Sequence, residues 1–136
     1  MVEPLPDQSH PARARRFILG VLAAAGLTGA AGVALAAAAA HKIDSPALAT
    51  AATMMMIHAA AATSLLAIAA AFQARVWAYI SALMLFAVVL FAGTISSHTA
   101  GFLAVPGFLA PIGGSLLIAS WIAVAVTAAM GVARGR

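Results

Sequence analysis

The chain has 136 residues, of which 65% are hydrophobic and 7% are charged. Soluble domains are about half apolar and about a quarter charged, so this composition excludes an ordinary soluble domain and indicates that the solvent is a lipid bilayer. The net charge is +4. The basic residues lie at the ends of apolar runs, a distribution that membrane topology explains better than nucleic-acid binding does. We therefore expect no nucleic-acid partner.

Residues 1–16 are polar and end in a basic cluster. The stretch contains three prolines, Pro4, Pro6 and Pro11. Because proline disrupts helices, we expect a disordered basic arm at residues 1–16. The arm closes with three arginines, Arg13, Arg15 and Arg16.

The first predicted span covers residues 17–40, which would be about 36 Å long at about 1.5 Å per residue and therefore long enough to cross a bilayer. Small residues recur at every fourth position: Gly20, Ala24, Thr28, Gly32, Ala36 and Ala40. Such a strip lets a second helix approach closely, although an alanine-rich helix can produce one by chance. A cleaved signal peptide is the alternative, but its apolar core is usually only about 7–15 residues long.

Three further spans follow, at residues 47–72, 76–97 and 112–132. Ser45 and Pro46 are typical of a helix start, as the capping residue and the first helical residue. Pro111 similarly precedes the fourth span. We therefore predict an all-α fold of four antiparallel transmembrane helices in up-and-down order.

The distribution of basic residues predicts the topology. Six arginines lie in the arm, the second connection and the tail: Arg13, Arg15, Arg16, Arg75, Arg134 and Arg136. The first connection has one lysine beside Asp44, and the third has no charge. The positive-inside rule then places both termini in the cytoplasm.

His58 is the one ionisable residue in the middle of a span. It lies twelve residues from Pro46, or about 18 Å below the start of the helix, near the midplane of the bilayer. An ionisable group at this depth is costly unless it faces the protein interior or water. We expect a neutral His58 to face the bundle interior and to bond helices one and two, through Thr28 or a carbonyl near Gly29. A binding role is the alternative.

Metal and cofactor sites have weak support. There is no cysteine, which excludes thiolate ligands. His41, His98 and Asp44 share the outer level and are weak candidates for a metal site of the nitrogen and oxygen type. His41 and His58 lie at different depths, so this pair within one copy is not expected to hold a haem. We expect no cofactor and, in the absence of nucleotide, zincin, hydrolase or paired-carboxylate motifs, no catalysis.

Four segments in order, 29–42, 49–59, 90–94 and 110–121, resemble the signatures of the transmembrane-protein-256-like family, a domain of unknown function with the number 423. The resemblance extends over about residues 20–129. It implies a small bacterial inner-membrane protein of four helices and implies no activity. Met54 and Met55 stand where family members usually carry polar residues, and Thr94 stands where many carry an acidic one.

Two functions are compatible with these observations. The first is a non-catalytic inner-membrane protein, embedded in the lipid bilayer as an accessory or scaffold subunit with other membrane-protein subunits. The second is a binder or transporter of a small molecule, lipid or ion that uses a cavity around His58.

Overall fold

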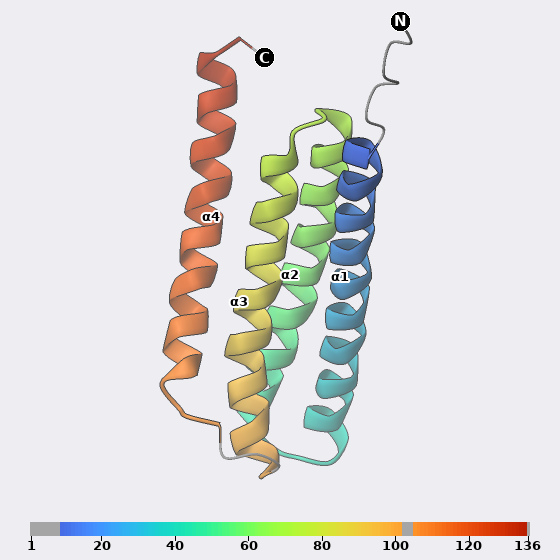
Figure 1. Ribbon diagram of the computed structural model, residues 1–136. Coiled ribbons are helices and arrows are strands. Elements are labelled where there is room, and N and C mark those ends of the chain that lie inside the picture. The colour runs from blue at the N-terminus through green and yellow to red at the C-terminus, as the bar shows by residue number, and fades with distance from the viewer. Residues whose placement is uncertain (1–8, 102–104, 136) are drawn as a thin grey trace, which may run out of the picture.

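The computed structural model describes residues 9–101 and 105–135. Within these residues the chain forms four helices, α1 (Ser9–His41), α2 (Pro46–Ala71), α3 (Arg75–Ala100) and α4 (Leu109–Ala133). Each is long and apolar enough to cross a membrane. Consecutive helices run in opposite directions (Figure 1). The predicted all-α bundle of four antiparallel helices is confirmed.

The helix ends differ from the predicted spans most strongly at the start of α1. This helix begins at Ser9, so the prediction of a disordered arm is wrong for residues 9–16, and residues 1–8 lie outside the described part. Pro11 is compatible with the helix because the first-turn N–H groups have no partner within a helix. The other ends lie within about three residues of the prediction, which is close to the uncertainty of any helix boundary.

Short, well-formed connections join the helices. Ser45 caps α2 as expected, since its Oγ accepts a hydrogen bond from the Leu48 N–H at 3.3 Å, and Pro46 is the first helical residue. Gln73 turns the chain between α2 and α3 with a φ of 50°. Gly101 ends α3 with a φ of 69°, a left-handed conformation that glycine adopts readily.

The helices α1, α2 and α3 form a three-helix unit in which each contacts the other two. The core lies along α2 and α3, where Ala51, Met84 and Val88 are almost completely buried. Ser81 is buried between these helices and donates a hydrogen bond to the Ala62 carbonyl at 3.0 Å. This bond crosses from α3 to α2 and fixes the register of the two helices.

The helix α4 is attached differently. It packs on α3, but in the described residues no Cα of α4 lies within 8 Å of a Cα of α1 or α2. Only 11% of its most apolar stretch is buried, against 50% for α3. Figure 1 shows α4 beside α3, on the side away from α1.

Glycines mark the closest approaches between helices. A Cβ added at Gly113 of α4 would lie 2.6 Å from the Phe91 nitrogen of α3, which no real side chain tolerates. At Gly32 of α1 it would lie 3.1 Å from the Ala52 carbonyl oxygen of α2. At Gly20 a Cβ would meet no atom within 4 Å. The predicted packing strip from Gly20 to Gly32 is therefore used at its Gly32 end and left open at its Gly20 end.

Candidate functional site

His58 is buried, with 5% of its surface exposed, and both of its ring nitrogens have partners. Its Nδ1 lies 2.7 Å from the Met54 carbonyl oxygen, one turn earlier in α2. Its Nε2 lies 3.3 Å from Nε1 of Trp121 in α4. The two rings meet edge to face, with centroids 6.2 Å apart.

These partners fix the tautomer of His58. The Met54 carbonyl can only accept, so the proton is on Nδ1. The Trp121 indole can only donate, so Nε2 carries the lone pair. A neutral imidazole therefore satisfies both bonds, whereas an imidazolium would point a second donor at the indole N–H. The histidine lies in the interior as expected, and its two partners suit a neutral imidazole.

The partner of His58 is not the one expected from the sequence. Thr28 donates its hydroxyl to the Ala24 carbonyl in its own helix, at 2.8 Å. A Cβ at Gly29 would contact the Ala59 Cβ at 3.5 Å, so Gly29 faces the residue after His58. Successive residues of a helix point about 100° apart, which turns His58 away from α1. The prediction that His58 bonds helices one and two is wrong; it bonds α2 to α4.

The sequence contains one signal that could have identified Trp121 as the partner of His58, namely the equal depth of the two residues along α2 and α4. Both α2 and α4 start at the same end of the bundle (Figure 1). Trp121 is twelve residues from Leu109, and His58 is twelve residues from Pro46, so both lie about 18 Å from their helix starts. Trp121 is 47% exposed, so its indole reaches His58 of α2 from the surface of the bundle and does not fill a closed core.

The weak metal candidates are not brought together. In residues 9–101 and 105–135 no three His, Asp or Glu side chains are grouped so as to hold a metal ion. His41, His98 and Asp44 are all exposed. His98 instead bonds through Nε2 to the Val105 carbonyl oxygen at 2.5 Å, across the connection that follows α3.

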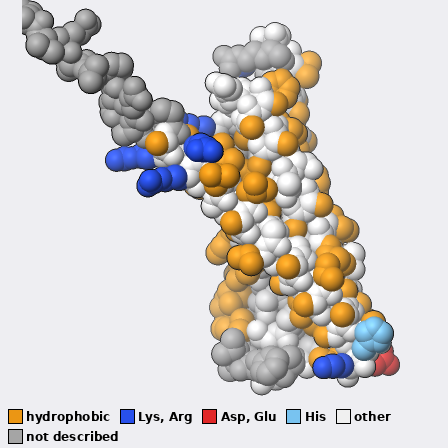
Figure 2. Space-filling model, turned by 90° about the vertical axis from the view of Figure 1, so that its right-hand side faces the viewer, with side chains coloured by type: hydrophobic (Ala, Val, Ile, Leu, Met, Phe, Trp, Pro, Cys, Tyr) orange, Lys and Arg blue, Asp and Glu red, His pale blue; other side chains and the backbone are white. Residues whose placement is uncertain are grey.

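The charged residues lie at the two ends of the bundle. Arg13, Arg75 and Arg134 belong to the start of α1, the start of α3 and the end of α4, which share one end in Figure 1. Arg15 and Arg16 follow Arg13 on α1, and Arg136 lies outside the described residues. Figure 2 shows several basic side chains at the end where α1 begins, another at the opposite end beside a histidine and an acidic side chain, and apolar side chains along the body.

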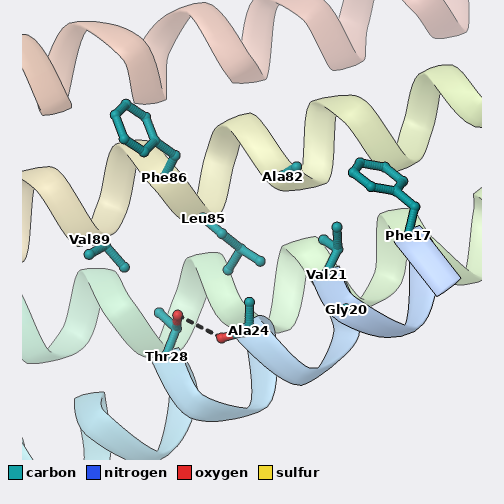
Figure 3. Close-up of a pocket in the computed structure, with 9 residues that line it drawn as sticks. All are labelled: Phe17, Gly20, Val21, Ala24, Thr28, Ala82, Leu85, Phe86 and Val89. Carbon is teal, nitrogen blue, oxygen red and sulfur yellow. Dashed lines mark hydrogen bonds between the residues drawn. The ribbon is translucent and has the colours of Figure 1, made fainter.

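Two hollows lie side by side between α1 and α3. The larger, of about 460 Å³, is an open apolar groove whose walls include Val21 of α1 and Leu85 of α3 (Figure 3). The smaller, of about 210 Å³, is lined by Arg13 and Arg75. Phe17 lines both, and His58 lines neither.

Comparison with protein families matches residues 28–114 to the family described as protein of unknown function, DUF423. The match covers more than half of the chain. The chain belongs to the DUF423 family. Comparison with curated proteins and with solved structures finds no match. The resemblance to the family of unknown function numbered 423 is thereby confirmed over residues 28–114.

This DUF423 protein carries Met54, Met55 and Thr94 where the resemblance implies other, polar or acidic residues. All three side chains serve in packing. Met55 is buried in the core, with Met54 packed against the same cluster. Thr94 is buried, and its hydroxyl donates to the Leu90 carbonyl at 2.7 Å in its own helix. These side chains therefore add no polar group beside His58.

Proposed function

We propose that this DUF423 protein is a non-catalytic integral membrane protein that serves as an accessory subunit of a larger membrane complex. The observation that supports this role is the attachment of α4, whose backbone, within the described residues, approaches α3 alone and whose Trp121 bonds to His58 of α2. A helix that contributes so little to its own bundle presents most of its surface to the surroundings. In a bilayer that surface is free to pack on a helix of another subunit.

One strip of the exposed surface of α4 consists of small residues, among larger apolar side chains. Small residues recur at every fourth position, at Ser115, Ala119 and Ala123, and the first two are exposed. Association of membrane helices depends on close backbone approach at such residues, because lipid gives no hydrophobic driving force. This strip therefore supports contact with a partner helix.

We further propose that the protein lies in a bacterial inner membrane with both termini in the cytoplasm. The support is the positive-inside rule, which assigns to the cytoplasm the end that carries Arg13, Arg75 and Arg134. The opposite end carries Lys42 beside Asp44. Single cysteines introduced at either end of this cysteine-free chain would report the orientation through labelling in intact cells.

The absence of catalysis is part of the proposal. His58 has the one ionisable side chain in the interior of a span, and both of its ring nitrogens are engaged with protein groups. The alternative of a small-molecule, lipid or ion binder centred on His58 has less support for the same reason. If His58→Leu abolished binding of a candidate ligand while the bundle stayed folded, that alternative would replace the present one.

Co-purification in mild detergent tests the subunit role. We expect a stoichiometric membrane-protein partner, identified by native mass spectrometry, and loss of that partner in Ala119→Phe. Ala30→Phe is the matched control, because Ala30 is also exposed but lies on α1. A stable lone monomer, or equal loss of the partner in both variants, would contradict the proposal.

A further inference from the structure

The two adjoining hollows between α1 and α3 combine an apolar groove with a basic mouth. The groove extends along α1 from Phe17 to Thr28, a rise of about 16 Å at about 1.5 Å per residue. Its volume of about 460 Å³ falls in the range of about 300–1,000 Å³ that is typical of ligand sites. It is open along its length, toward the surroundings of the bundle.

The lining of the groove is apolar except for the hydroxyl of Thr28. Val21 and Leu85 point toward one another across it (Figure 3). The one hydroxyl in its wall, that of Thr28, is occupied by its bond to the Ala24 carbonyl. Gly20 leaves the wall open, since a Cβ there would meet nothing within 4 Å. The groove therefore suits a hydrocarbon chain and offers nothing to a polar ligand.

The mouth of the groove has the opposite chemistry. Arg13 from α1 and Arg75 from α3 line it together with Tyr79. Phe17 lines both hollows, and its ring centroid lies 5.2 Å from that of Tyr79. Arginine is the residue best suited to bind phosphate, because its planar group presents several donors at once.

No acidic side chain lines either hollow. In the described part of the chain the sole acidic residue is Asp44, which lies between α1 and α2 at the opposite end of the bundle. Glu3 and Asp7 precede the described residues. The charge of the two arginines at the mouth is therefore complementary to an anion from outside the bundle.

We propose that this site binds one anionic phospholipid, with its phosphate between Arg13 and Arg75 and an acyl chain in the groove between α1 and α3. The mouth lies where the apolar part of α1 begins, at the level of lipid headgroups, and the groove leads from it toward the bilayer interior. Basic pockets between membrane helices at this level are a known form of headgroup recognition. A soluble anion would use the mouth and leave the groove without a function. The site does not depend on the proposed role in a complex.

The test compares lipids of equal acyl chains on the purified full-length protein in neutral detergent. Native mass spectrometry titrates phosphatidylglycerol and phosphatidylcholine and gives a Kd for the first bound lipid. Each arginine near an anionic headgroup contributes about fivefold in affinity. We therefore expect Arg13→Gln with Arg75→Gln to weaken phosphatidylglycerol binding about thirtyfold and to leave phosphatidylcholine binding nearly unchanged.

Matched variants distinguish binding at Arg13 and Arg75 from attraction by the overall positive charge of this end of the bundle. Arg15→Gln with Arg134→Gln removes the same charge from the same end, but neither residue lines a hollow, and we expect the affinity to persist. Gly20→Leu fills the groove, so both lipids should bind more weakly. Gly26→Leu is its control on the same helix, because Gly26 is equally open and lies outside the groove.

Several results would overturn the proposal. Equal affinity for the two lipids in the wild-type protein would remove the role of the arginines. Equal losses in the two double-arginine variants would assign the preference to diffuse charge. Loss of bound phosphatidylglycerol on adding millimolar inorganic phosphate would reassign the mouth to a soluble anion, and Gly20→Leu without effect would remove the groove.

Discussion

The contact at Gly113 gives the sharpest test of how α4 is held. A Cβ added there would lie 2.6 Å from the Phe91 nitrogen and 2.9 Å from the Ala87 carbonyl oxygen. Both are backbone atoms of α3, so no side-chain rotation can relieve the clash in Gly113→Ala. The two helices must separate at this point. Among the described residues, the backbone of α4 approaches no other helix, and its bond to α2, between Trp121 and His58, would be lost with the same movement.

The expected magnitude follows from two opposing terms. Replacing glycine by alanine inside a helix stabilises it by about 1 kcal/mol, while overpacking a tight contact costs about 1–3 kcal/mol. With backbone on both sides, we take the upper end and expect Gly113→Ala to lower the free energy of unfolding by about 2 kcal/mol. At Gly114 a Cβ would meet only ring carbons of Phe91, at 3.8 and 3.9 Å. Gly114→Ala should therefore stabilise the protein by about 1 kcal/mol.

Adjacent glycines thus give effects of opposite sign. The assay is unfolding by SDS in mixed micelles, followed by circular dichroism. In a Trp77→Phe background, quenching of Trp121 by brominated lipid should also increase for Gly113→Ala, because its indole loses contact with His58. If Gly113→Ala and Gly114→Ala shifted the unfolding free energy in the same direction, the described approach of α4 to α3 would be refuted.

Three further experiments test the other helix contacts. Gly32→Leu should destabilise the α1–α2 contact by about 1–3 kcal/mol in the same SDS titration. Gly26→Leu is the control and should leave this contact intact. Equal effects of the two substitutions would contradict the close approach of α1 to α2 at Gly32. Ser81→Ala should cost about 0.6 kcal/mol, the average for a hydrogen bond between membrane helices, and no change would mean that the α3–α2 bond contributes nothing. A double-mutant cycle of His58→Leu and Trp121→Phe should give a coupling of about 0.5–1 kcal/mol, and strict additivity would argue against their bond.

The spans and connections were predictable because they depend on chemistry that is local in the sequence. Uninterrupted apolar runs define four crossings, and the Ser45–Pro46 pair defines the start of α2. The one substantial error is the start of α1. A proline reads as a helix breaker, but the first turn has no N–H bonds for Pro11 to remove, so the helix begins at Ser9.

The rotation of each helix about its axis was not predictable in the same way. In a soluble helix the polar side marks the exterior, but here apolar residues cover every side of the helices. Gly20 and Gly32 are alike in the sequence, yet only Gly32 meets a neighbouring helix closely. The depth of His58 was correctly placed, but its direction depended on packing that brings Ala59 rather than His58 against α1. The pairing of Arg13 and Arg75 at the mouth of the groove was likewise not predictable. The two residues are 62 positions apart, and the sequence assigned them only to topology.

The attachment of α4, through its contact with α3 and the Trp121–His58 bond to α2, also bears on how copies of the chain could exchange parts. The unit formed by α1, α2 and α3 is complete before α4 is synthesised, and α4 follows the connection between Ala100 and Leu109. Docking of α4 against α3 of a neighbouring copy would reproduce the Gly113 contact and the Trp121–His58 bond without opening either three-helix unit. An exchange of α4 between two copies would therefore leave the contacts within each three-helix unit intact.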